Sequence, residues 1–169
     1  MRIERVMRHP ITPAELFEIS LLAEYQNAKC KAAGALSSHV VVEIDGDTAV
    51  VRTRRKMPTI GFPSLIRKIV PLGVTTTETI TWLAPDPDGS RDATIHVDFH
   101  GAPARMGGSM RLEPDGRPDA SVLVIDADFT ALVPLVGSRI EKLAAPIISS
   151  VLDAEEETGR SWVAESRGV

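Results

Sequence analysis

The chain has 169 residues, 43% hydrophobic and 25% charged, a composition typical of one globular domain with a substantial core. Its 19 basic and 23 acidic residues give a net charge of −4, which argues against a nucleic-acid-binding protein. The single cysteine, Cys30, excludes an internal disulfide bond, and no apolar stretch is long enough to span a bilayer. We expect one domain over residues 1–169, without integral membrane contact, in the cytoplasm.

The first elements in chain order are a short strand and two short helices. Residues 2–8 have the alternation of a strand. Thr12 and Glu15 have the spacing of a capping box, in which each side chain satisfies a free backbone N–H of the other. The helical pattern that follows is interrupted near Ser20 and ends at Gly34, a residue common just after helices.

The middle of the chain predicts six strands in succession. Residues 40–44 and 50–51 flank Asp45-Gly46, a strong hairpin signal. Residues 57–73 are rich in Pro and Gly, which predicts an irregular loop with one helical turn near residues 64–69. This loop should cover one entrance of a cavity inside the domain, because its apolar residues Ile60, Phe62, Leu65 and Ile69 need cover. Further strands are predicted around residues 74–84, 95–100, 106–112 and 120–132.

The last quarter of the chain predicts one long amphipathic helix over residues 138–162. Its apolar stripe comprises Ile140, Leu143, Ala144, Ile147, Val151, Ala154, Thr158 and Trp162. Ser138 and Glu141 have the spacing of a second capping box. Pro146 lies on the polar side, where it should bend the helix around a core.

The order β-αα-β6-α predicts an α+β helix-grip fold, a curved antiparallel sheet wrapped around a long C-terminal helix. An open cone of the nuclear-transport-factor type is the alternative, but that architecture usually places its long helices first. The order of elements resembles the START and birch-pollen-allergen superfamily, also known as SRPBCC, which includes polyketide cyclases and lipid-transport domains.

Three segments carry a narrower resemblance. Glu78 to Trp82, His100 to Pro103 and, most specifically, Val133 to Lys142 are similar to the bacterial domain-of-unknown-function 2505 family. The resemblance covers essentially the whole chain. It implies the helix-grip fold and the superfamily's tendency to bind apolar molecules, and it supplies no catalytic residue.

A cavity between sheet and helix is the predicted functional site. Its expected wall comprises Met57, Phe62, Glu78, Ile80, Trp82, Val97, Phe99, Met110, Phe129, Ile140, Leu143 and Ile147. Glu78 shares strand parity with Ile80 and Trp82, so alternation points it inward. It either reaches water at the sheet rim or is the polar group of the cavity, a weak candidate for a general acid or base. Arg52 is the cation expected to face it if the two are paired.

His96, Asp98 and His100 fall on one strand face with the spacing and chemistry of metal ligands. The opposite face of this strand holds Val97 and Phe99, which must point to the core. The three polar residues therefore face water, with no fourth ligand evident nearby, and a solvated surface is the favoured interpretation. We predict neither a metal site nor a cofactor.

The only basic cluster comprises Arg52, Arg54, Arg55, Lys56, Arg67 and Lys68. It could attract an anionic head group or an acidic membrane surface. The favoured interpretation is that these charges protect an edge strand from pairing with another chain.

Three functions remain open at this point. The first is binding of a hydrophobic small molecule, lipid-like or polyketide-like, in the cavity between sheet and helix. The second is an enzyme of the cyclase or hydratase kind in the same cavity, which would need inward-facing acid–base groups. The third is an interaction protein with a filled core. The direction of side chains discriminates among them, and the oligomeric state is not fixed by the sequence.

Overall fold

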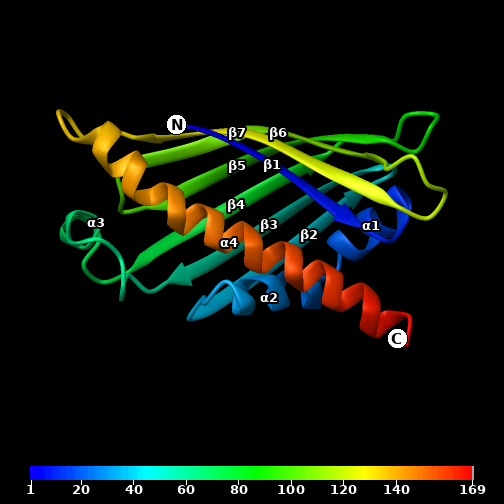
Figure 1. Ribbon diagram of the computed structural model, residues 1–169, viewed down its shortest axis with the longest axis horizontal. Coiled ribbons are helices and arrows are strands. Elements are labelled where there is room, and N and C mark those ends of the chain that lie inside the picture. Colours follow the sequence, from blue (N-terminus) through cyan, green and yellow to red (C-terminus); the bar gives the residue numbers. More distant parts are fainter. Residues whose placement is uncertain (169) are drawn as a thin grey trace.

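The computed structural model describes residues 1–168. Its elements in chain order are β1 (Arg2–His9), α1 (Pro13–Ser20), α2 (Ala23–Ala32), β2 (Ser37–Asp45), β3 (Thr48–Met57), α3 (Ser64–Ile69), β4 (Val74–Trp82), β5 (Arg91–His100), β6 (Ala104–Pro114), β7 (Ser121–Ala131) and α4 (Gly137–Ser166). Figure 1 shows α4 running diagonally across the sheet, with α1 and α2 beside its C-terminal half. The predicted helix-grip fold and element order are confirmed, with α3 as the short helical turn of the long loop.

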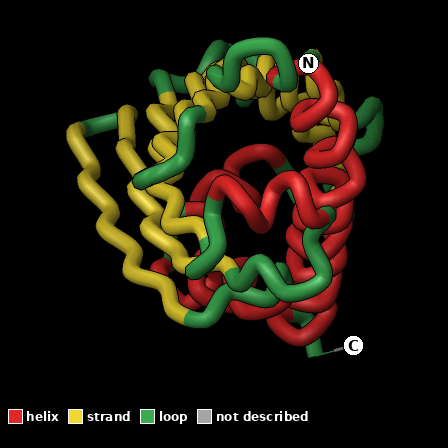
Figure 2. The backbone as a smooth tube through the Cα atoms, turned by 90° about the vertical axis from the view of Figure 1, so that its left-hand side faces the viewer, coloured by secondary structure: helices red, strands yellow, loops and turns green. Residues whose placement is uncertain are grey.

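One antiparallel sheet of seven strands has the order β1-β7-β6-β5-β4-β3-β2. Each strand from β2 to β7 pairs with its neighbour in sequence, and β1 closes onto β7, the last strand of the chain. The sheet curves around the helices, and α3 lies across one end of the space that the sheet and α4 border (Figure 2).

Local sequence signals explain how the first helices begin and end. The Thr12 hydroxyl accepts a hydrogen bond from the Glu15 N–H at 3.2 Å, and the Glu15 carboxylate accepts one from the Thr12 N–H at 2.8 Å. The predicted capping box is therefore confirmed. Gly34 follows α2 with a φ of 86°, a left-handed conformation that glycine adopts without a steric cost.

The predicted hairpin and the long loop after it are confirmed, with two differences. The turn between β2 and β3 consists of Gly46 and Asp47, because Asp45 is still paired with Thr48. Ile60 is 89% exposed and not sheltered, so the expectation that it needs cover was wrong.

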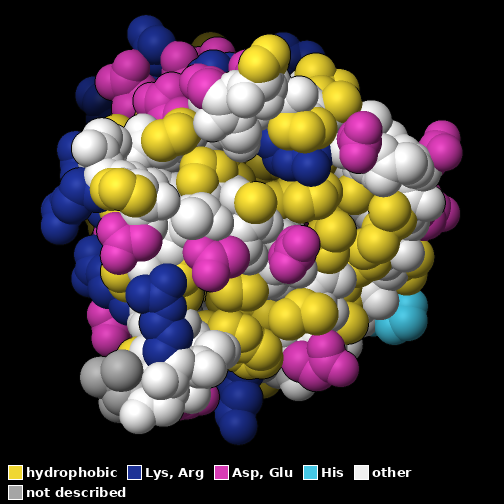
Figure 3. Space-filling model, turned by 90° about the vertical axis from the view of Figure 1, so that its right-hand side faces the viewer, with side chains coloured by type: hydrophobic (Ala, Val, Ile, Leu, Met, Phe, Trp, Pro, Cys, Tyr) yellow, Lys and Arg dark blue, Asp and Glu magenta, His cyan; other side chains and the backbone are white. Residues whose placement is uncertain are grey.

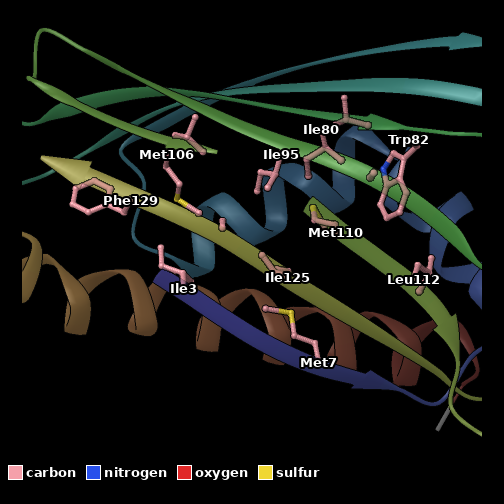
Figure 4. Close-up of a cluster of buried hydrophobic side chains, with 14 of the residues drawn as sticks. Ile3, Met7, Ile80, Trp82, Ile95, Met106, Met110, Leu112, Ile125 and Phe129 are labelled. Atoms are coloured by element: carbon pink, nitrogen blue, oxygen red, sulfur yellow. The ribbon is translucent and has the colours of Figure 1, made fainter. Parts of the chain in front are cut away.

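The core lies on the concave face of the sheet. On β4, Ile80 and Trp82 are buried while Thr79 and Thr81, which alternate with them, are only half-buried, as predicted. Side chains of neighbouring strands gather on this same side of the sheet (Figure 4). Gly108 of β6 lies where a Cβ atom would come within 2.1 Å of the Asp126 carbonyl oxygen on β7, so only glycine permits this close strand approach.

The long helix α4 has 30 residues and spans roughly 45 Å at about 1.5 Å per residue. It begins one residue earlier than predicted, and the capping box of Ser138 and Glu141 was wrong. The Glu141 carboxylate instead accepts a hydrogen bond from the Ala131 N–H of β7 at 3.1 Å. A tertiary contact has thus replaced a local one, and it fixes the start of α4 against the end of the sheet. Pro146 lies inside the helix on its exposed side, as expected.

Exposed apolar side chains are scattered over the surface and not confined to the loop that carries α3. The large ones are Val6, Leu22, Leu36, Val41, Ile44, Ile60, Leu72, Leu83, Leu132 and Leu135. The end of the molecule that carries α1 shows apolar side chains with acidic ones dispersed among them (Figure 3). In the described part of the chain, no helix combines the length and apolar character needed to cross a membrane.

Candidate functional site

A cavity of about 240 Å³ lies between the concave face of the sheet and the helices. Strands β3 to β7 form one wall, and α4 forms the opposite wall. The loop that contains α3 contributes Phe62, Ile66, Ile69 and Val70, which lie at one end of the space. An engineered cavity of about 150 Å³ holds benzene, so this volume suits a molecule of about ten carbon atoms.

Eleven of the twelve residues predicted to line the cavity do so. They are Met57, Phe62, Glu78, Ile80, Trp82, Val97, Phe99, Met110, Phe129, Ile140 and Ile147. They were identified because strand parity and the helical stripe are local patterns that the fold preserves. Their contact with a ligand is a proposal that we develop below.

Leu143 is the exception, because it is only half-buried and does not line the cavity. The residues of α4 that do are Ile140, Ala144, Ile147, Ile148, Val151, Leu152 and Glu155. Each residue of an α-helix is rotated by about 100° from the one before it. On this basis, Leu143 points about 100° away, around the helix axis, from the average direction of the cavity-lining residues. The true stripe is rotated relative to the predicted one, and it continues to Gly159 and Val163 and not to Thr158 and Trp162.

A buried ion cluster forms the polar part of the cavity wall. Arg55 of β3 donates a hydrogen bond to Oε1 of Glu155 on α4 at 2.8 Å. The ammonium group of Lys29 on α2 lies 3.2 Å from the other carboxylate oxygen, Oε2. These three side chains are only 10–14% exposed. Burial opposes ionisation of Glu155, but Lys29 and Arg55 outweigh it and hold the pKa of this carboxyl well below its usual range.

Glu78 of β4 faces this cluster without joining it. It lies opposite Thr53 in the β3–β4 register, two residues from Arg55 along β3. It lines the cavity, and no hydrogen bond or ion pair links its side chain to any other residue between 1 and 168. Burial raises the pKa of Glu78, and so does the negative charge of Glu155, while Arg55 and Lys29 oppose the rise. Glu78 is therefore a carboxyl group that holds its proton more tightly than usual.

The expectation that Arg52 is the cation facing Glu78 was wrong. Arg52 points to the convex face and pairs with Glu43 at 2.6 Å. The cations near Glu78 are Arg55 and Lys29. The interpretation of the basic cluster as edge protection was also wrong. Its strand members Arg52, Arg54, Arg55 and Lys56 lie on β3, which is an internal strand, and Arg67 and Lys68 lie on α3. Arg55, moreover, turns inward. Arg55 has the same strand parity as Val51 and Thr53, which are both buried. This parity could have shown from the sequence that Arg55 turns inward.

A second polar corner lies where β1, α2 and α4 meet. His9 and Tyr25 line the cavity there, and both are buried. Gly159 of α4 makes room for them, since a Cβ atom at this position would lie 2.8 Å from His9 Cε1 and 3.1 Å from the Tyr25 hydroxyl. Burial lowers the pKa of His9, with Glu156 opposing, and its Nδ1 atom has no partner within the described chain. Neither His9 nor Tyr25 was expected from the sequence.

The sequence-predicted residues outside the cavity behave as surface or core. His96 and Asp98 are exposed and contact each other at 3.0 Å, and His100 contacts Thr77 on the same surface. Across residues 1–168, no group of His, Cys, Asp or Glu side chains has the arrangement of a metal site. Cys30 is buried, which raises the pKa of its thiol and leaves it a small apolar side chain.

Comparisons with known proteins support the same fold. A family model described as a protein of unknown function, DUF2505, matches residues 5–163. No curated protein sequence matches the chain.

Three solved structures illustrate the similarity in fold. TTHA0849 from Thermus thermophilus superposes with a TM-score of 0.59 at 17% identity, covering 94% of this chain and 97% of its own. The Zhui aromatase/cyclase from Streptomyces sp. R1128 gives 0.56 at 12% identity, covering 94% and 93%. A START superfamily protein from Mycobacterium smegmatis gives 0.53 at 12% identity, covering 92% and 94%. At such low identities these structures show only that the fold is shared with this chain.

Proposed function

This chain belongs to the DUF2505 family, and from that premise we propose that it binds a hydrophobic small molecule, lipid-like or polyketide-like, in the cavity between the sheet and α4. The single observation that carries the proposal is the cavity itself. Its wall is apolar except for the charged cluster, the His9–Tyr25 corner and three uncharged polar residues, Ser20, Gln26 and Thr76. A ligand of this shape gains ~25 cal/mol for each Å² of apolar surface that it removes from water.

The energetic cost of the cavity supports an occupant. An empty apolar cavity closed to water destabilises a protein by about 24 cal/mol per Å³, so the upper limit for 240 Å³ is roughly 6 kcal/mol. This cost is comparable to the whole stability of a typical domain, about 5–15 kcal/mol. Larger apolar side chains at the lining positions would fill this space. A cavity of this size is therefore better explained by a ligand than by poor packing. The same volume argues against the third alternative, an interaction protein with a filled core.

Native mass spectrometry of the protein purified from its own host tests the proposal. We expect one small molecule to be retained and then released on denaturation. Ile147→Trp places a larger side chain in the cavity and should abolish this retention while the protein stays folded. Ile44→Trp makes the same change at an exposed position and should leave the ligand bound. If the wild-type protein carries no ligand, or if both variants retain the molecule equally, the cavity is not the binding site.

A cyclase- or hydratase-type enzyme is the second candidate, because Glu78 is an unpaired carboxyl group beside two cations inside the cavity. One protein of similar fold is an aromatase/cyclase. Glu78 would then act as the general acid or base. Purifying both Glu78→Gln and wild type from the host tests this. An enzyme should yield different molecules from the two proteins, and the one held by Glu78→Gln should be converted when wild type is added. A pure binding protein should yield the same molecule from both.

The compartment remains part of the proposal. We place the protein in the cytoplasm, and the buried thiol of Cys30, which has no partner cysteine in the sequence, supports a reducing environment.

A further inference from the structure

The charges around the cavity do not balance unless Glu78 is ionised. Lys29 and Arg55 each carry a positive charge, and Glu155 carries one negative charge. With Glu78 ionised, the cluster is neutral but contains a half-buried carboxylate that faces the cavity and that no cation contacts directly. With Glu78 protonated, the cluster carries one excess positive charge beside an apolar cavity. Both states are costly in an environment of low polarity, because a buried charge needs a partner.

A ligand with a single negative charge removes this imbalance. It would neutralise the excess positive charge while Glu78 stays protonated and donates a hydrogen bond to it. Lys29 and Arg55 have N–H donors left after their contacts with Glu155, so they can donate to the same ligand group. A ligand amine would instead add a second positive charge next to two cations. A phosphate monoester, with nearly two negative charges at neutral pH, would leave an excess negative charge.

The shape of the site places that charge at one end of the ligand. The cluster occupies the wall where α2, β3, β4 and α4 meet, and the strands on the far side of β4 contribute apolar residues to the cavity. On β5, the residue opposite Glu78 is Val97, and no charged residue of β5, β6 or β7 lines the cavity. A charged end therefore has one place to bind, and an apolar body has the remaining wall.

We propose that the ligand is an apolar molecule with one terminal carboxylate, and that protonated Glu78 donates a hydrogen bond to that carboxylate beside Lys29 and Arg55. This inference rests on the proposed function, because it names the chemical class of the ligand of the same cavity. A proton enters with the ligand whenever Glu78 is ionised in the empty protein. The groups that face Glu78 and set this balance are Glu155 from α4, Arg55 from β3 and Lys29 from α2.

Isothermal titration calorimetry with three probes of equal chain length tests the inference. The probes are decanoate, decan-1-ol and methyl decanoate, which differ only in the polar end. Decanoate should bind at least about tenfold more tightly than the other two, the ratio that one extra buried charge contact of about 1.4 kcal/mol produces. Titrations in two buffers of different ionisation enthalpy at about pH 8 should show proton uptake with decanoate and none with decan-1-ol.

Glu78→Gln supplies the decisive variant, because glutamine keeps the shape and an N–H donor but cannot take up a proton. Between about pH 6 and about pH 9 decanoate stays ionised. Its affinity for wild type should fall by up to about tenfold per pH unit as Glu78 ionises. Its affinity for Glu78→Gln should be flat, with no proton uptake. Asp98→Asn changes an exposed carboxylate and should behave as wild type.

The outcomes separate the two levels of the proposal. If all three probes bind equally and without proton uptake, the cavity binds apolar ligands as proposed, but the carboxylate inference is wrong. If Glu78→Gln keeps the pH dependence of wild type, another group takes up the proton and the role of Glu78 is wrong. If none of the probes binds to wild type, the proposed function fails for ligands of this size, and the inference fails with it.

Discussion

Two clusters of the same residue types lie on opposite faces of one sheet. On the convex face, Arg111 contacts Asp92 at 2.8 Å, Glu113 at 3.2 Å and Asp86 at 3.3 Å, and all four side chains are 40–55% exposed. On the concave face, the carboxylate of Glu155 holds two cations at nearly the same distances, but with only 10–14% exposure.

The two clusters differ in their exposure to water. On the convex face, water screens each charge, so the contacts form and break at little cost and contribute little to stability. On the concave face, every charge must find a partner in the protein or its ligand, and apolar side chains of similar volume would often be as stable or more stable. A buried cluster that leaves Glu78 without a direct partner is therefore weak evidence for stability, and it is the basis of the ligand-binding role that we propose.

The largest effect is expected from removing the shared carboxylate of the buried cluster. Glu155→Leu leaves Lys29 and Arg55 buried without the carboxylate that contacts them both, and with only Glu78, which contacts neither, as a carboxyl group nearby. Breaking a buried ion pair in this way costs about 3–5 kcal/mol. Urea unfolding at pH 7 measures the free energy of unfolding. A loss below about 1 kcal/mol would mean that water reaches the cluster freely, and the contrast between the two faces would disappear.

The second effect concerns the His9–Tyr25 corner of the cavity. Gly159→Ala introduces a Cβ atom 2.8 Å from His9 Cε1, and overpacking of this kind costs about 1–3 kcal/mol. Thermal unfolding followed by circular dichroism measures it. Ser150→Ala, an exposed position on the same helix, is the matched control and should change little. If Gly159→Ala is neutral, this corner is loosely packed, and the cavity wall is not rigid there.

The third effect is a gain in stability that depends on pH. Because the pKa of Glu78 is raised in the folded protein, its contribution to stability is present below the usual glutamate pKa and is lost as the pH rises through the folded value. Glu78→Gln should therefore be more stable than wild type at pH 8, by about 0.5–2 kcal/mol, the range common for a single stabilising substitution. The difference should shrink towards pH 5 in paired urea titrations.

Two controls accompany the Glu78→Gln comparison. Glu155 loses its contribution as the pH falls towards its lowered pKa, but it does so in wild type and variant alike, so the comparison between them removes it. Asp98→Asn, which makes the same kind of change at an exposed position, is measured in parallel. A loss of stability in Glu78→Gln at pH 8 would mean that ionised Glu78 holds the cluster together, contrary to our account.

The smallest effect is expected on the convex face. Arg111→Met removes three exposed ion contacts at once. Its shift in the urea midpoint should be less than about a quarter of that for Glu155→Leu, and it should shrink further in high salt. A shift as large as that of Glu155→Leu would show that burial is not what separates the two clusters.

The sequence was informative wherever structure follows from neighbouring residues. The Thr12 capping box, the glycine that ends α2 and the alternation of β4 involve contacts within a few positions, and all three were predicted. The capping box of Ser138 and Glu141 was equally plausible locally. It failed because the Ala131 N–H on β7 competes for the same carboxylate, which a local pattern does not reveal.

The polar end of the cavity shows the same limit more clearly. Glu78 was identified by strand parity, but its neighbours come from three other elements. Arg55 was interpreted as one of a basic run, although its parity points inward. Lys29 and Glu155 lie on helices whose orientation toward the sheet is set by packing. Only the fold brings a lysine, an arginine and a glutamate from distant positions to one carboxyl group.

The protonation of Glu78 itself is the most direct test of this account. Its side-chain carboxyl can be followed by ¹³C NMR as a function of pH, with Glu78→Gln used to assign the signal. We predict a pKa above that of an ordinary glutamate in the free protein, a further increase with decanoate and no further change with decan-1-ol. An ordinary pKa that ignores decanoate would place Glu78 in contact with bulk water and contradict the distinction between the two faces of the sheet.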